Sequence, residues 1–213
     1  MPGDLDTKAG GNVPLQNRVM PDGRIVVDPA RGCFTGNRGI LTFDDAGRLG
    51  ARRWSHHAWI ICTLEHPRGR YHGPQPQNAW TPLFFLDEAV ALAAGHRPCG
   101  YCRRDAFDAF RRASGIDRAP QIDRALHRAR VRRDRTQITH VARADTLPDG
   151  AFIRHEGAPW IVQGGSIRRF TPGGYRDRAT RPHGEVTVLT PAPTVAALAG
   201  GYIPALHPSL SAP

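Results

Sequence analysis

The chain of 213 residues has little of what marks membrane, secreted or disulfide-stabilised proteins. No apolar run approaches the roughly 20 residues that a membrane-spanning helix needs, so we expect no membrane partner. Residues 1–11 are polar and acidic and lack the apolar core of a signal peptide, which predicts a cytoplasmic protein. Cysteine is scarce too. Four cysteines in a reducing compartment are typical of a metal site or of buried thiols rather than disulfides.

Lysine and aromatic side chains are also scarce. Lys8 is the only lysine among 29 basic residues, and aromatic residues make up 8% of the chain. The 23 glycines and 19 prolines predict many turns around a modest core. Arginine carries nearly all of the net charge of +10, and its forked guanidinium suits phosphates and guanine edges. The charge favours nucleic acid as a partner, although an arginine bias also arises in GC-rich genomes.

The chain divides into three parts by pattern. Residues 1–30 read as a loose lead-in, and residues 31–135 combine strands and helices. Residues 136–213 carry short apolar runs between glycine turns, which predict a small antiparallel sheet or barrel. The expected fold class is therefore α+β.

Individual elements follow from apolar periodicity and turn residues. Helices are predicted at 84–94, 105–113, 121–133 and 194–198. Strands are predicted at 24–27, 40–43, 58–62, 138–141, 152–154, 160–162, 167–170 and 186–189. The polar, proline-rich stretch 66–82 is a predicted surface loop.

Cys99 and Cys102 form a C-x-x-C pair just after the end of the first predicted helix. This spacing puts two thiolates on one side of a tight turn, as tetrahedral Zn²⁺ requires. A redox pair and two inert thiols are the alternatives. The pair does not open a helix after a βαβ strand, where a redox pair is expected. The spacing thus favours a zinc site.

The residues around this pair resemble the second half of the Ada-type zinc domain of proteins that repair methylphosphotriesters in DNA. Over residues 84–104 the shared pattern is a Glu-Ala helix, then Gly-aromatic-Arg-Pro-Cys-x-x-Cys-Arg. The resemblance implies that Cys99 and Cys102 bind structural zinc and that nearby arginines face DNA phosphates. It also implies a small zinc-knuckle α/β half, Ada-like, at residues 31–135. An Arg-rich helix and a β-rich C-terminal half would follow.

The chain departs from that family upstream of the pair. The family has a further C-x-x-x-C pair, whereas the other cysteines here, Cys33 and Cys62, are 29 positions apart. Cys62 ends a predicted buried strand and is the better third ligand. The fourth ligand stays open among Cys33, His57 and His96. His96 replaces the family's aromatic residue, and His-x-x-Cys-x-x-Cys is a workable donor spacing. Because the family's methyl acceptor is a zinc-bound thiolate, the missing pair argues against methyl transfer.

Asp123 and His127 are four residues apart on a predicted helix and therefore share a face. A half-buried carboxylate and imidazole could act as an acid/base pair, while an ordinary surface i,i+4 pair is the alternative. Six arginines lie between residues 124 and 135, which predicts a phosphate-binding face or a solvated helix face. The predicted DNA-binding residues are Asn37, Arg38, Arg52, Arg53, Arg97, Arg103, Arg104, Arg124, Arg128 and Arg132.

These features predict a zinc-containing, DNA-binding hydrolase that acts on damaged or modified DNA. The leading reaction is base excision of the DNA glycosylase type, in which Asp123 stabilises an oxocarbenium-like sugar and His127 orients or protonates. A nuclease is the second reaction. The alternatives are a non-catalytic zinc-scaffolded DNA-binding module and a thiolate that accepts an alkyl group once. DNA binding would place the protein with the nucleoid.

Overall fold

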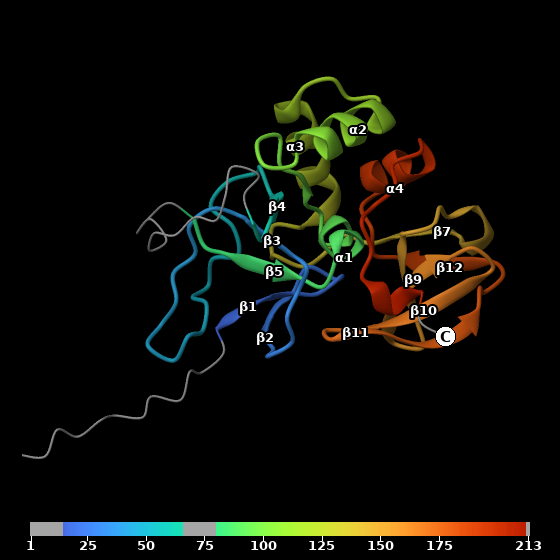
Figure 1. Ribbon diagram of the computed structural model, residues 1–213, viewed down its shortest axis with the longest axis horizontal. Coiled ribbons are helices and arrows are strands. Elements are labelled where there is room, and N and C mark those ends of the chain that lie inside the picture. Colours follow the sequence, from blue (N-terminus) through green and yellow to red (C-terminus); the bar gives the residue numbers. More distant parts are fainter. Residues whose placement is uncertain (1–14, 66–79, 212–213) are drawn as a thin grey trace, which may run out of the picture.

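The computed structural model describes residues 15–65 and 80–211, which form two six-stranded β-sheets with helices packed between and beside them (Figure 1). The presence of helices together with two separate sheets confirms the α+β class. Most of the predicted loop at 66–82 lies outside the described residues. Within the described ranges, no helix combines the length and the apolar character that crossing a bilayer demands.

The first sheet contains short strands of the N-terminal half in the order β2-β1-β5-β3-β4-β6. β1 runs parallel to β5 and β4 runs parallel to β6, whereas the other neighbours are antiparallel. The strands are Gln16–Val19 (β1), Ile25–Val27 (β2), Phe34–Asn37 (β3), Ile60–Thr63 (β4), Leu83–Phe85 (β5) and Arg97–Pro98 (β6). The expected lead-in thus supplies two strands of this sheet.

A glycine explains why β3 lies at Phe34–Asn37 and not at the predicted 40–43. A Cβ on Gly36 would lie 2.1 Å from the carbonyl oxygen of Ile60, so only glycine permits β3 and β4 to pair this closely. Residues 40–43 contribute only an isolated bridge between Phe43 and Leu49. Asn37, one of the predicted DNA-binding residues, is therefore the last residue of a sheet strand.

The first helix, α1 (Glu88–Ala93), begins later than predicted because β5 takes the preceding residues. Asp87 is its N-cap, and the Asp87 carboxylate accepts a 3.0 Å hydrogen bond from the backbone N–H of Val90. Gly95 follows with a φ of +84°, the left-handed conformation expected after a helix end. The remaining helices are α2 (Arg104–Ser114), α3 (Ala119–Arg130), α4 (Ala192–Ala199) and the short 3₁₀ turns η1 (Ala144–Thr146) and η2 (Pro208–Leu210).

The second sheet is antiparallel throughout, in the order β11-β10-β9-β8-β12-β7. Its strands are His140–Arg143 (β7), Phe152–His155 (β8), Ala158–Gln163 (β9), Ser166–Thr171 (β10), Gly174–Thr180 (β11) and Glu185–Val188 (β12). β11 has no sequence prediction because it buries little beyond Tyr175 and exposes charged residues such as Arg176 and Arg178. The predicted β-rich character of this half is confirmed.

Helix α1 lies between the two sheets (Figure 1). Ala89 and Val90 share a buried cluster with Phe152 of the second sheet, while Leu92 belongs to the cluster that contains Phe85 of the first. All six residues of α1 are buried. The helix is therefore the apolar link between the two halves.

Two buried carboxylates reinforce that link. Asp87 accepts a hydrogen bond from the hydroxyl of Tyr175 at 2.7 Å, and Glu88 accepts one from the hydroxyl of Tyr202 at 2.6 Å. Glu88 also accepts two hydrogen bonds from the guanidinium of Arg103, at 2.6 and 2.8 Å. Burial raises the pKa of Asp87, and burial beside Asp87 raises that of Tyr175 well above 10. Each buried oxygen thus has a partner, as a charged group in a core requires.

Candidate metal centre and arginine surface

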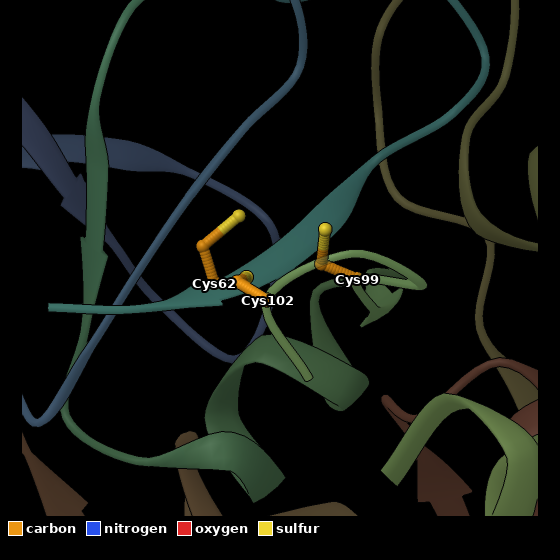
Figure 2. A group of neighbouring side chains, drawn as sticks. All are labelled: Cys62, Cys99 and Cys102. Carbon is orange, nitrogen blue, oxygen red and sulfur yellow. The ribbon is translucent and has the colours of Figure 1, made fainter. Parts of the chain in front are cut away.

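Three cysteine side chains converge at the edge of the first sheet (Figure 2). Cys62 belongs to β4, and Cys99 and Cys102 belong to the turn between β6 and α2. The parallel pairing of β4 with β6 brings this turn beside Cys62, since the N–H of Cys99 donates to the carbonyl of Ile61 at 2.9 Å. The three sulfur atoms lie within 4.8 Å of one another, so they could hold a metal ion.

The backbone around the turn is arranged to stabilise thiolates. The N–H of Tyr101 donates to Cys99 Sγ at 3.4 Å, and the N–H of Thr63 donates to Cys102. Hydrogen bonds from the thiols of Cys102 and Cys62 lower the pKa of Cys99 to about 2. Hydrogen bonding with Cys102 and Cys99 raises the pKa of Cys62. A thiolate held by two thiols and by backbone N–H groups is the electrostatic setting in which a cation replaces protons.

None of the three candidates for the fourth ligand belongs to this group of sulfur atoms. His96 is fully buried and uses both ring nitrogens elsewhere: Nε2 accepts from Arg38 Nε at 3.2 Å, and Nδ1 pairs with the carbonyl of Ala91 at 3.2 Å. His57 stacks on His127 with ring centroids 3.7 Å apart. Cys33 is an exposed thiol before β3. The described residues therefore supply three donors, and the fourth ligand stays open.

Asp123, predicted as the catalytic carboxylate, is directed toward Arg97. Its Oδ1 accepts from Arg97 Nε at 2.7 Å and its Oδ2 from Arg97 Nη2 at 2.9 Å. The Asp123 residue is 8% exposed. His127 lies against His57 and Trp54, and its Nδ1 is 3.2 Å from Arg130 Nη2. The predicted pair therefore has two separate sets of partners, and its catalytic role stays a prediction.

The predicted DNA-binding arginines fall into two groups by exposure. Arg38, Arg97 and Arg103 point into the protein, where Arg97 pairs with Asp123 and Arg103 with Glu88. Asn37 is also buried and accepts from the N–H of Gly39. The exposed or half-exposed group is Arg52, Arg53, Arg104, Arg124, Arg128 and Arg132.

One hydrogen bond links two of the segments that carry exposed arginines. Arg135 donates to the carbonyl oxygen of Ala51, which joins the turn after α3 to the segment of Arg52 and Arg53. We define the arginine surface as the exposed or half-exposed Arg52, Arg53, Arg124, Arg128, Arg132, Arg133 and Arg135. It combines the exposed face of α3 with residues 132–135, which follow that helix, and with residues 52–53. Arg104, by contrast, pairs with Asp108 on α2.

A second cluster was not predicted from the sequence. The guanidinium carbons of Arg38 and Arg130 lie 3.9 and 3.7 Å from the centroid of the Trp59 ring. Both arginines are 2% exposed. The sequence contains one signal for the burial of Arg130, because this residue follows Ile122 and Leu126 at intervals of four on the buried face of α3.

Comparisons of the chain with protein-family models, with curated proteins and with solved structures find no match.

Proposed function

We propose that this chain is a zinc-containing DNA-binding protein. The cysteine group holds zinc as a structural element, and the arginine surface contacts the phosphate backbone. The observation that carries the proposal is the arginine surface. Its exposed arginines on and after α3 are joined to the segment of Arg52 and Arg53 by the Arg135–Ala51 hydrogen bond. A protein that neutralises several phosphates releases their counterions, and this release supplies much of the affinity for DNA.

Zinc fits the cysteine donor set. It is a borderline-soft cation that binds thiolates at about 2.3 Å in tetrahedral sites, which places sulfur atoms about 3.8 Å apart. The observed sulfur group, within 4.8 Å, is compatible with that spacing. A metal there would join β4 to the turn before α2, and the Arg97–Asp123 ion pair joins the residues just before that turn to α3. Zinc would thus stabilise the position of α3, the helix that carries Arg124 and Arg128.

The exposed arginines are available for phosphates. In the described parts of the chain, neither Arg124 nor Arg128 nor Arg132 has a carboxylate within 4.0 Å. Asp123 is engaged by Arg97, and Asp134 accepts from the N–H and hydroxyl of Thr136. A cationic surface without internal counter-ions favours an external polyanion.

Base excision stays a prediction from the sequence. Its general acid/base would have to be a carboxylate free to contact a sugar or a water, and both oxygens of Asp123 accept from Arg97. Incubating the protein with plain and alkylated duplexes and measuring abasic sites or nicks tests the reaction separately from binding.

The binding proposal is tested by fluorescence anisotropy on a labelled duplex in increasing salt. For six to ten phosphate contacts, the affinity should fall roughly 10³- to 10⁵-fold between about 50 and 200 mM salt. The triple variant Arg124→Ala/Arg128→Ala/Arg132→Ala should reduce the slope of log K against log[salt] by about 2 to 3.

The matched control removes three exposed arginines from the second sheet, in Arg154→Ala/Arg176→Ala/Arg178→Ala. Both triples change the net charge equally, so only the position differs. The control should keep the wild-type slope. Equal losses in the two triples, or a flat salt response of the wild type, would contradict the proposal.

A further inference from the structure

The indole of Trp59 lies between two buried guanidinium groups. Those of Arg38 and Arg130 are each less than 4 Å from the ring centroid, and two such groups cannot occupy one face without overlap. They must therefore stack on opposite faces, where each gains a cation–π interaction. Trp59 is 3% exposed, so the stack belongs to the interior.

In the part of the chain that the structure describes, neither cation contacts a carboxylate. Within the described residues, Arg38 is bonded to His96 Nε2 and to the carbonyl of Gly23, both at 3.2 Å. Arg130 donates at 2.7 Å to the carbonyls of Gly95 and His57. Among residues 15–65 and 80–211, Arg38 Nη2 and Arg130 Nε find no hydrogen-bond partner. Buried charges are normally paired with an opposite charge. Two buried guanidinium groups that contact no carboxylate among the described residues therefore favour an anionic ligand.

Both arginines line a cavity of about 410 Å³. Five arginines and two aspartates face it, which leaves an excess of three positive charges. These charged residues are Arg24, Arg38, Arg53, Arg130, Arg135, Asp22 and Asp134. Asp22 is already paired with Arg24 at 2.7 Å. The excess charge therefore comes from Arg38 and Arg130 in the interior and from Arg53 and Arg135 nearer the solvent.

Burial opposes the charged state of the two inner arginines. It lowers the pKa of Arg38 to about 9 and that of Arg130 to about 8, with Arg53 contributing to the first and Arg38 to the second. A bound anion would offset this penalty. The repulsion among these arginines favours an anion, because the charge of a bound anion would offset that repulsion.

We propose that this cavity is a binding site for a phosphate group, held by Arg38 and Arg130 from the interior and by Arg53 and Arg135 from the rim. A doubly charged phosphate monoester matches the excess charge better than a carboxylate does. Its oxygens also accept the forked N–H groups of arginine. The half-buried Trp54 lines the same cavity and offers an apolar surface to the group that carries the phosphate.

The site shares Arg53 and Arg135 with the arginine surface. It can nevertheless be tested apart from DNA binding, because a free nucleotide presents the same phosphate group as the 5′ end of a DNA strand. The test is the melting temperature of the full chain, measured with inorganic phosphate and with chloride or acetate at equal ionic strength. We expect phosphate alone to raise it by several degrees at saturation. Binding should also change tryptophan fluorescence, since Trp54 and Trp59 line the cavity.

The variant is made at the rim residue Arg53, because Arg38 is buried against Trp59 and its removal would disturb the core. Arg53→Ala should weaken phosphate binding roughly tenfold, as expected for one charged hydrogen bond. Arg112→Ala on α2 loses the same charge at an exposed position away from the cavity, and it should bind like the wild type. AMP and a 5′-phosphorylated oligonucleotide, each compared with its unphosphorylated form, distinguish the two sources.

Three results would overturn the proposal. The first is an unchanged melting temperature in phosphate. The second is an equal response to acetate, and the third is an equal loss of binding in Arg53→Ala and Arg112→Ala. A failure here leaves DNA binding intact if the salt dependence of the arginine surface is still observed.

Discussion

Arg97 and Asp123 join the cysteine-bearing turn to helix α3 through two hydrogen bonds, Nε to Oδ1 at 2.7 Å and Nη2 to Oδ2 at 2.9 Å. Arg97 precedes Cys99 by two residues, and Asp123 lies on the helix that also presents Arg124 and Arg128. The pair therefore couples the candidate metal centre to the arginine surface.

Removing either member of this pair should destabilise the fold. Arg97→Ala and Asp123→Ala each leave one uncompensated buried charge, and we expect losses of about 3–5 kcal/mol in the free energy of unfolding. Urea denaturation measures the change. Arg104→Ala, which breaks the exposed pair with Asp108, should cost less than about 1 kcal/mol. Should Asp123→Ala keep its stability and lose an activity on DNA, a catalytic role would be the better explanation.

The zinc content of the purified protein should depend on Cys62, Cys99 and Cys102. Cys62→Ser, Cys99→Ser and Cys102→Ser should each lose bound zinc, because a serine hydroxyl is a far poorer ligand than a thiolate. Elemental analysis of the purified variants measures the zinc-to-protein ratio. Cys33→Ser is the matched control and should keep the wild-type content, since its thiol lies outside the sulfur group. Full zinc retention in Cys99→Ser would refute the site.

The two halves should be coupled through Glu88. Tyr202→Phe removes the hydroxyl that donates to Glu88 at 2.6 Å, and a hydrogen bond to a buried charge is worth about 1.5–3 kcal/mol. Thermal and urea unfolding should both show the loss. Ile203→Val, at the neighbouring residue that is 86% exposed, should change stability by less than about 0.5 kcal/mol. Equal effects of the two changes would argue against the coupling.

Stability should decrease in mild acid. Burial, with Arg38 and Arg130, lowers the pKa of His96 well below 6.5, and burial, with Arg130 and His57, lowers that of His127 to about 4. The unfolded chain takes up protons on these imidazoles near pH 6.5, whereas the folded chain does not. The histidine contribution is therefore complete above pH 6.5 and is lost as the pH falls toward 4.

Urea unfolding at pH 7 and at pH 5 measures this dependence. His127→Gln should reduce the difference between the two midpoints, because one imidazole with a lowered pKa is removed. His183 is exposed and lies in the other half of the chain, and His183→Gln serves as the control. An unchanged difference in His127→Gln would contradict the assignment.

Local pattern predicted most of the elements. The apolar spacing of Phe107 and Phe110 predicted α2, and the apolar runs between glycine turns predicted most of the second sheet. Patterns failed where a contact with a distant segment decided the structure. Gly36 permits β3 because it faces the carbonyl of Ile60, and the residues before Asp87 form a strand because neighbours pair with them.

The sequence by itself determined the C-x-x-C turn, since its spacing is a local property, whereas the pairing of β4 with β6 brings Cys62 beside it. Tertiary structure alone decided which arginines face solvent. Arg97 and Arg124 look alike in the sequence, yet one is buried against Asp123 and the other is exposed. A guanidinium can be buried only where acceptors or an aromatic face meet it, and distant parts of the chain supply those partners.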